Sequence, residues 1–171
     1  MLFILSGCVS DGQDYQKKYG SNTPLFVDGI EDAKSRKILI FMDGTGNNDN
    51  PKTANTNLLQ LYNLSLEKKH GARVIPFYIQ GVGSKWFNKI LGGVTGLGLN
   101  KKIMLAYKFI VNNYKEGDEI YIFGFSRGAY SARSLNGLIE FANIIDRNKI
   151  DPKDLNAQIR SVFKSYHISD D

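Results

Sequence analysis

The stretch Tyr121–Tyr130 reads YIFGFSRGAY and places a serine between two glycines at the end of an apolar run. Gly124-Phe-Ser126-Arg-Gly128 matches G-x-S-x-G, the pattern of a strand that turns into a helix within a few residues. Such a turn strains the serine backbone and exposes its hydroxyl, and the glycines admit a close approach where a Cβ would clash. The pattern predicts Ser126 as a nucleophile. The alternative is a glycine-rich strand–helix corner with a capping serine.

Three continuous apolar runs predict strands buried on both faces of a parallel sheet. They are Lys37–Met42, Arg73–Ile79 and Glu119–Phe123, although Pro76 weakens the second. Helical spacing predicts helices over Thr56–Lys69, Asn100–Tyr114 and residues 127–141, and Asp151-Pro152 predicts the start of a fourth helix. Thr56 or Asn55 is the expected N-cap of the first helix. Alternation of strands and helices predicts an α/β fold, with a mostly parallel sheet and flanking helices.

Composition narrows the function classes. A chain of 171 residues suggests one domain, and 42% hydrophobic with 23% charged residues is typical of a soluble globular protein. The net charge is +5, but the lysines are scattered, which argues against nucleic acid as a partner. The phosphate-binding patterns G-x-x-x-x-G-K-[ST] and G-x-G-x-x-G are absent, which disfavours a nucleotide-binding domain. A single cysteine excludes an internal disulfide and a cysteine-rich zinc site, and no metal or cofactor is expected.

The cysteine, Cys8, ends a short apolar segment at the N-terminus. Leu5-Ser-Gly-Cys8 resembles the bacterial lipoprotein box, which implies cleavage before Cys8 and lipidation of its thiol. Residues 1–8 would be the signal, and the polar residues 9–36 a tether and domain entry. Only five apolar residues precede Ser6 and no basic region does, so the alternative is an accidental match. We expect a lipid-anchored protein of the bacterial cell envelope if the box is real, and otherwise a cytoplasmic or secreted one.

A second loop follows the first predicted strand. In proteins with a G-x-S-x-G turn, a second oxyanion donor comes from the loop after an earlier strand. Asp43-Gly44-Thr45 holds that position, so the backbone N–H of Gly44 or Thr45 would complete an oxyanion hole with that of Arg127. The alternative is a plain turn that caps the next helix.

Longer segments carry a family resemblance. FMDGTGNN, YIQGVGS and GLGLNKKIMLAYKFIVNNYKEGDEIYIFGFSRGAYSARSLNGLI resemble the uncharacterised α/β-hydrolase family called domain of unknown function 2235. That family includes the catalytic domains of type VI secretion phospholipase effectors. The resemblance covers roughly residues 37–145 and implies a Ser-Asp-His hydrolase acting on esters, with phospholipids as the best-known substrates. It implies Ser126 as nucleophile and the Asp43-Gly44-Thr45 loop as the oxyanion wall.

Measured against that family, residues 37–171 would form a partial, C-terminally truncated α/β-hydrolase domain. We therefore expect the strand at Glu119–Phe123 to form a bare edge of the sheet. In this fold the histidine follows the serine, and His167 is the only histidine that does. A histidine near a chain end is usually just solvated, and His70 precedes the serine. The acids after the G-x-S-x-G turn at residues 124–128, called the elbow below, are Glu140, Asp146, Asp151 and Asp154, and nothing in the sequence ranks them.

Other side chains suit a lipid substrate. Phe125, Tyr130 and Trp86 could line an acyl site, with core packing as the alternative. Arg127 and Arg133 could attract a phosphate headgroup, with a helix-surface ion pair as the alternative for Arg133. The sequence thus predicts a lipase-like serine hydrolase of the ester or phospholipid class. The alternative function is a non-catalytic hydrolase relic, or a lipid-tethered module that binds without turnover.

Overall fold

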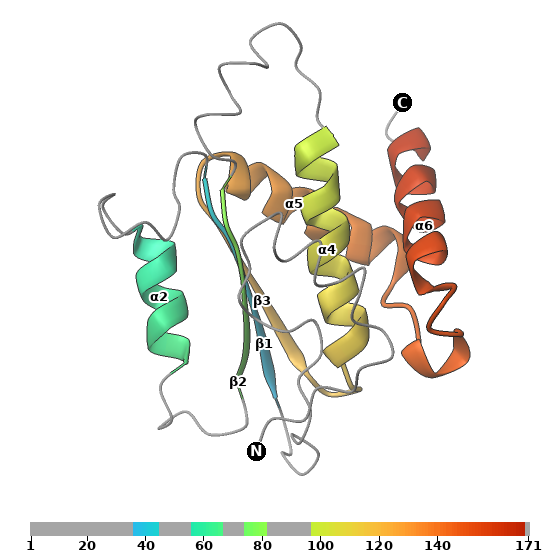
Figure 1. The fold of residues 1–171 in the computed structure, drawn as a ribbon, viewed down its shortest axis with the longest axis horizontal. Helices are drawn as coiled ribbons and strands as arrows, with labels where there is room; N and C mark the ends of the chain where they lie inside the picture. The colour runs from blue at the N-terminus through green and yellow to red at the C-terminus, as the bar shows by residue number, and fades with distance from the viewer. Residues whose placement is uncertain (1–35, 45–55, 67–73, 82–96, 170–171) are drawn as a thin grey trace, which may run out of the picture.

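In the described part of the chain, a three-stranded parallel sheet forms the centre of the fold (Figure 1). The computed structural model describes residues 36–44, 56–66, 74–81 and 97–169. The strands are β1 (Lys37–Met42), β2 (Val74–Ile79) and β3 (Glu119–Gly124), in the order β2-β1-β3. In both pairings Met42 ends the register, opposite Ile79 and opposite Gly124. All three carboxyl ends therefore meet at one edge of the sheet.

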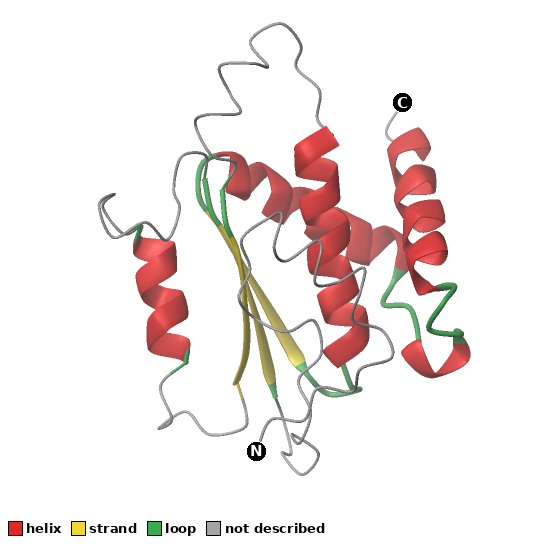
Figure 2. Ribbon diagram, in the orientation of Figure 1, coloured by secondary structure: helices red, strands yellow, loops and turns green. Residues whose placement is uncertain are grey.

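Helices cover both faces of this sheet (Figure 2). Helix α2 (Asn57–Ser65) lies on one face, and α4 (Leu97–Asn113) and α5 (Arg127–Ala142) lie on the other. Helix α6 (Leu155–Ser169) packs outside α4 and α5, and a short 3-10 helix, η2 (Arg147–Lys149), precedes it. The predicted α/β fold with a parallel sheet and flanking helices is confirmed.

The larger core lies between the sheet and α4 and α5. Phe77 and Phe109 stack there at 4.2 Å between ring centroids, and Ile38, Ile40 and Ile110 are fully buried. A smaller cluster of Phe41, Leu59 and Tyr78 joins the other face to α2. Burial of these side chains is the main favourable term in folding, at about 25 cal/mol per Å² of apolar surface.

The predicted positions of the three strands are confirmed, and the place of β2 in the sheet explains why it tolerates a proline. Within the described ranges β2 pairs with β1 alone, so the missing N–H of Pro76 interrupts no second ladder there. The prediction that β3 is buried on both faces is wrong, because Tyr121 and Phe123 are 41% and 37% exposed. Among the described residues β3 pairs with β1 alone, as expected of an edge strand. Its other apolar side chains, Ile120 and Ile122, pack against the larger core.

Two helix starts differ from the sequence prediction. Thr56 caps α2 as expected, since its side chain accepts a hydrogen bond from the Leu59 N–H at 3.2 Å. Helix α4, however, begins three residues earlier than predicted, at Leu97. Helix α6 begins at Leu155, because Asp151–Asp154 closes a turn in which the Asp154 N–H donates to the Asp151 carbonyl at 2.9 Å.

A buried ion pair fastens the amino end of the sheet. The Arg36 and Asp118 side chains are 5% and 4% exposed, and Arg36 Nε donates to Asp118 Oδ1 at 2.9 Å. Arg36 Nη2 also donates to the Asn113 carbonyl at 2.6 Å. The fork of the guanidinium thus joins the start of β1 to the end of α4 and to the turn before β3, with bidentate geometry.

The predicted close approach of strand and helix is confirmed at both elbow glycines. A Cβ on Gly124 would lie 2.6 Å from the Ala129 Cα. A Cβ on Gly128 would lie 2.6 Å from the Met42 carbonyl carbon and closer still to its oxygen. That oxygen also accepts a hydrogen bond from the Phe125 N–H at 3.1 Å. Helix α5 therefore rests on the carboxyl end of β1 with only a hydrogen between them.

We expect Gly128→Ala to destabilise the fold by about 3 kcal/mol or more, because the added methyl meets backbone that cannot rotate away. Gly137→Ala in the same helix is the control, since its methyl would meet the hydroxyl at the end of the Tyr166 side chain rather than backbone. Urea unfolding followed by circular dichroism measures both. Equal stability of the two variants would contradict the prediction.

Candidate active site

Ser126 lies at the junction of β3 and α5, at the carboxyl edge of the sheet. Its backbone has φ 55° and ψ −125°, which is rare for a residue with a side chain and indicates local strain. The residue is exposed, and its side chain makes no capping hydrogen bond to the helix. Ser126 therefore occupies the N-cap position of α5 without using its side chain as a cap. Its hydroxyl lies at the surface, at the start of a 16-residue helix.

Gly44 packs directly against this serine. A Cβ on Gly44 would lie 3.0 Å from the Ser126 Cβ and 3.0 Å from Phe125 Cδ1. The structure thus brings Gly44 to the elbow, while the oxyanion wall itself stays a prediction. The Gly44 N–H, however, donates to Asp43 Oδ1 at 2.7 Å, so this donor is already engaged. Thr45, the alternative donor, lies outside the described residues.

Asp43 joins three elements beneath the site. Its carboxylate is buried and accepts hydrogen bonds from the Tyr78 hydroxyl at 2.7 Å and from the Thr56 hydroxyl. With the bond from Gly44, it fixes the ends of β1 and β2 and the cap of α2 relative to one another. Sequence reasoning placed Asp43 in the loop but missed this role. The available signal was an acid directly after a buried strand.

Lys102 brings a buried positive charge to the same edge. It is 4% exposed, and its Nζ donates to the carbonyl of Gln80, directly after β2. Burial lowers the pKa of Lys102 to about 8; the charge of Asp43 raises that pKa and the charge of Arg127 lowers it. Sequence reasoning missed this residue, because Lys101-Lys102 has the appearance of an ordinary surface pair.

The candidate base lies elsewhere in the structure. The His167 ring contacts Phe163 and Tyr166, with centroids 4.6 and 5.7 Å away, and Tyr166 packs on Phe141 at 5.8 Å. Phe141 follows Ser126 by 15 residues, which is about 22 Å along α5 at 1.5 Å per residue. The structure therefore does not bring His167 to Ser126. His167 Nε2 is buried without a hydrogen-bond partner among the described residues.

The candidate acids serve local structure. Asp146 caps η2 by accepting from the Asn148 N–H at 3.0 Å, and this bond lowers its pKa. Asp151 accepts from the Lys153 N–H at 3.0 Å. Glu140 and Asp154 are exposed. No hydrogen bond described for these residues reaches Ser126.

The side chains predicted for a lipid substrate divide into two groups. Phe125 and Tyr130 are 52% and 57% exposed beside the elbow, so core packing is excluded for both, and Arg133 is exposed on α5. Trp86, His70 and Cys8 lie outside the described residues. In the part of the chain that the structure describes, no helix combines the length and apolarity needed to cross a bilayer.

A strained serine between a parallel strand and a helix, at the carboxyl edge of the sheet, is the arrangement of α/β hydrolases. The chain belongs to the family described as T6SS, phospholipase effector Tle1-like, catalytic domain, whose model matches residues 36–170. This match confirms the relation to phospholipase effector catalytic domains. The finer assignment to the 2235 family stays a prediction.

A curated relative also matches part of the chain. The uncharacterised protein YEL023C of Saccharomyces cerevisiae (strain ATCC 204508 / S288c) is 33% identical over 147 residues, which cover 77% of this chain. The matched part spans 21% of the yeast protein. No solved structure matches the chain.

Lys102 generates a prediction about pH. Because its folded pKa of about 8 lies below the unfolded value of 10.5, the unfolded chain holds a proton that the folded chain lacks between these values. The unfolding free energy of the wild type should therefore rise over this pH range relative to Lys102→Met, by up to about 3 kcal/mol. Urea titrations from pH 7 to pH 10.5 measure it, with Lys101→Met as control. Parallel curves for wild type and Lys102→Met would refute it.

Proposed function

We propose that the chain is a serine hydrolase of the ester and phospholipid class, with Ser126 as nucleophile. The observation that carries this proposal is the backbone of Ser126, held at φ 55° where strand meets helix. Strain of this kind persists only where the surrounding structure enforces it, and here Gly124 and Gly128 admit the packing that does so. Membership of a family of phospholipase effector catalytic domains supports the substrate class.

In the proposed reaction the Ser126 hydroxyl attacks the acyl carbonyl, and the developing oxyanion is held at the start of α5. Arg127 occupies the first turn of that helix, where backbone N–H groups point out of the helix end and the helix dipole favours negative charge. Gly44 can supply a second N–H only if its bond to Asp43 opens. The exposed rings of Phe125 and Tyr130 would contact the acyl chain, and Arg127 or Arg133 the phosphate.

The proposed enzyme still needs a base. None of the contacts described for His167 reaches Ser126, and His70 lies outside the described residues. This observation favours a second candidate function, a non-catalytic hydrolase relic or a module that binds lipid without turnover. Lipidation of Cys8 would tether either form to the cell envelope. Mass spectrometry of the purified mature chain would detect that modification.

We expect a fluorophosphonate probe to label the purified chain, because an activated serine attacks phosphorus as it attacks a carbonyl. Labelling should disappear in Ser126→Ala and persist in Ser134→Ala, a serine two turns further along α5. In-gel fluorescence with tryptic mapping measures the site.

Labelling that survives in Ser126→Ala would place the nucleophile elsewhere. A folded wild-type sample with no labelling would favour the binding module over the hydrolase. For any sample that the probe labels, the substrate class is then tested with phosphatidylcholine vesicles, and hydrolysis is measured as the release of fatty acid.

A further inference from the structure

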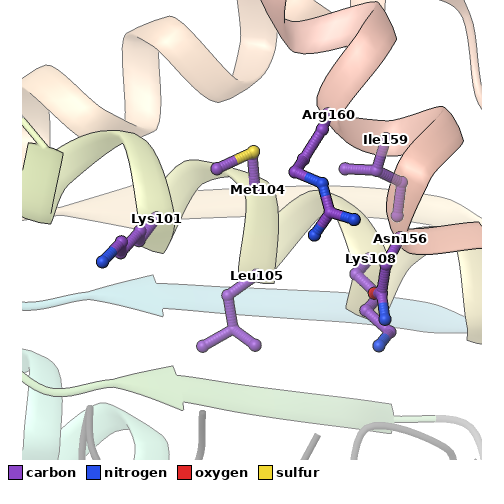
Figure 3. Close-up of a pocket in the computed structure, with 7 residues that line it drawn as sticks. All are labelled: Lys101, Met104, Leu105, Lys108, Asn156, Ile159 and Arg160. Atoms are coloured by element: carbon purple, nitrogen blue, oxygen red, sulfur yellow. The ribbon is translucent and has the colours of Figure 1, made fainter. Parts of the chain in front are cut away.

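A cationic groove lies between α4 and α6, apart from the carboxyl edge that holds Ser126 (Figure 3). Lys101 and Lys108 line it from α4, and Arg160 and Asn156 line it from α6. Its remaining lining is apolar and consists of Met104, Leu105 and Ile159. The described residues that line the groove include no carboxylate.

Helical geometry separates this groove from the candidate active site. Positions 101, 105 and 108 lie on one face of α4, at the spacing of four and then three residues. Ile103, Tyr107 and Ile110, all fully buried, lie on the opposite face and pack toward the sheet. A ligand in the groove would therefore sit outside the helix layer, where Ser126 cannot reach it.

The chemistry of the lining selects the ligand. Arginine offers a planar fork of donors that matches phosphate oxygens, lysine adds a mobile point charge, and the Asn156 amide adds a neutral donor. Figure 3 shows the Arg160 side chain extending from α6 toward α4. Lys101 and Arg160 have no ion pair or hydrogen bond among the described residues, so their charges are not neutralised within that part of the chain.

The apolar floor distinguishes a lipid from other anions. Leu105 and Ile159 are 4% and 3% exposed at the base of the groove, and Met104 is half-buried beside them. A nucleic acid would be expected to stack its bases on aromatic rings, and none lines this groove. A phosphate attached to a glycerol and acyl chains offers both an anion for the rim and hydrocarbon for the floor.

We propose that the α4–α6 groove binds the phosphate of an anionic phospholipid headgroup and so docks the domain on a lipid surface. The choice of a lipid rests in part on the proposed function, but binding requires no catalysis. The groove holds a second lipid molecule while the substrate occupies the elbow.

The test is sedimentation of the full chain with phosphatidylcholine vesicles that contain phosphatidylglycerol, in a Ser126→Ala background that leaves the lipid intact. One basic residue near an anionic surface is worth about fivefold in affinity, so Lys101→Gln with Arg160→Gln should weaken binding by about 25-fold. The matched control, Lys115→Gln with Lys149→Gln, removes the same charge from exposed positions elsewhere and should retain most of the affinity.

Each other outcome overturns the proposal. Equal losses in the two double variants would mean diffuse attraction of a basic protein. Equal binding to vesicles of pure phosphatidylcholine would exclude recognition of the anion. Full displacement by a few millimolar inorganic phosphate, at constant ionic strength, would assign the groove to free phosphate.

The double variant Lys101→Arg with Arg160→Lys keeps both charges and should bind like the parent chain. Failure to bind, in a sample with unchanged thermal melting, would exclude a charge-based site. Fluorophosphonate labelling of the Ser126 form reports separately on the proposed function.

Discussion

The contact between Gly128 and the Met42 carbonyl is the constraint on which the rest of the structure depends. It sets how near α5 can approach β1, and β3 turns into α5 at Ser126, two residues before this contact. The positive φ of Ser126 follows from this packing rather than from any preference of serine. The energy of the larger core, buried along α4 and α5, thus holds one residue in a conformation that it would not adopt in a free peptide.

Beneath this turn, the carboxyl edge of the sheet is organised by charge. Asp43 receives hydrogen bonds from β2 and from the cap of α2, while Lys102 lies within the field of both Asp43 and Arg127. Opposite charges in a poorly solvated site offset the desolvation free energy of each other. If one charge is lost, the desolvation of the remaining charge is no longer offset. The two loops that would form an oxyanion hole are therefore supported by a polar layer, in contrast to the apolar contacts of the sheet interior.

The sequence predicts the elements well where the signal is local. Continuous apolar runs located all three strands, and the glycines of the G-x-S-x-G pattern located the helix contact at Gly124 and Gly128. Prediction failed where the answer lies in tertiary packing. The exposed face of β3 depends on how far α2 extends across the sheet, and the start of α6 depends on a turn at Asp151. Lys102 acquires its role only because Asp43 and Arg127, which are distant in sequence, meet it in space.

The strand order also has a consequence for the time course of folding. Because β1 is central, its first residue must pair with Val74 on one side and with Glu119 on the other. Arg36 and Asp118, the buried ion pair at the amino end, are 82 positions apart in the chain. Contacts between residues so far apart in the chain form slowly, because the entropy of closing the loop is lost before the contact stabilises it. A ribosome that has delivered β1 and β2 has therefore produced one of the two described ladders, and the second edge of β1 stays unpaired until β3 is synthesised.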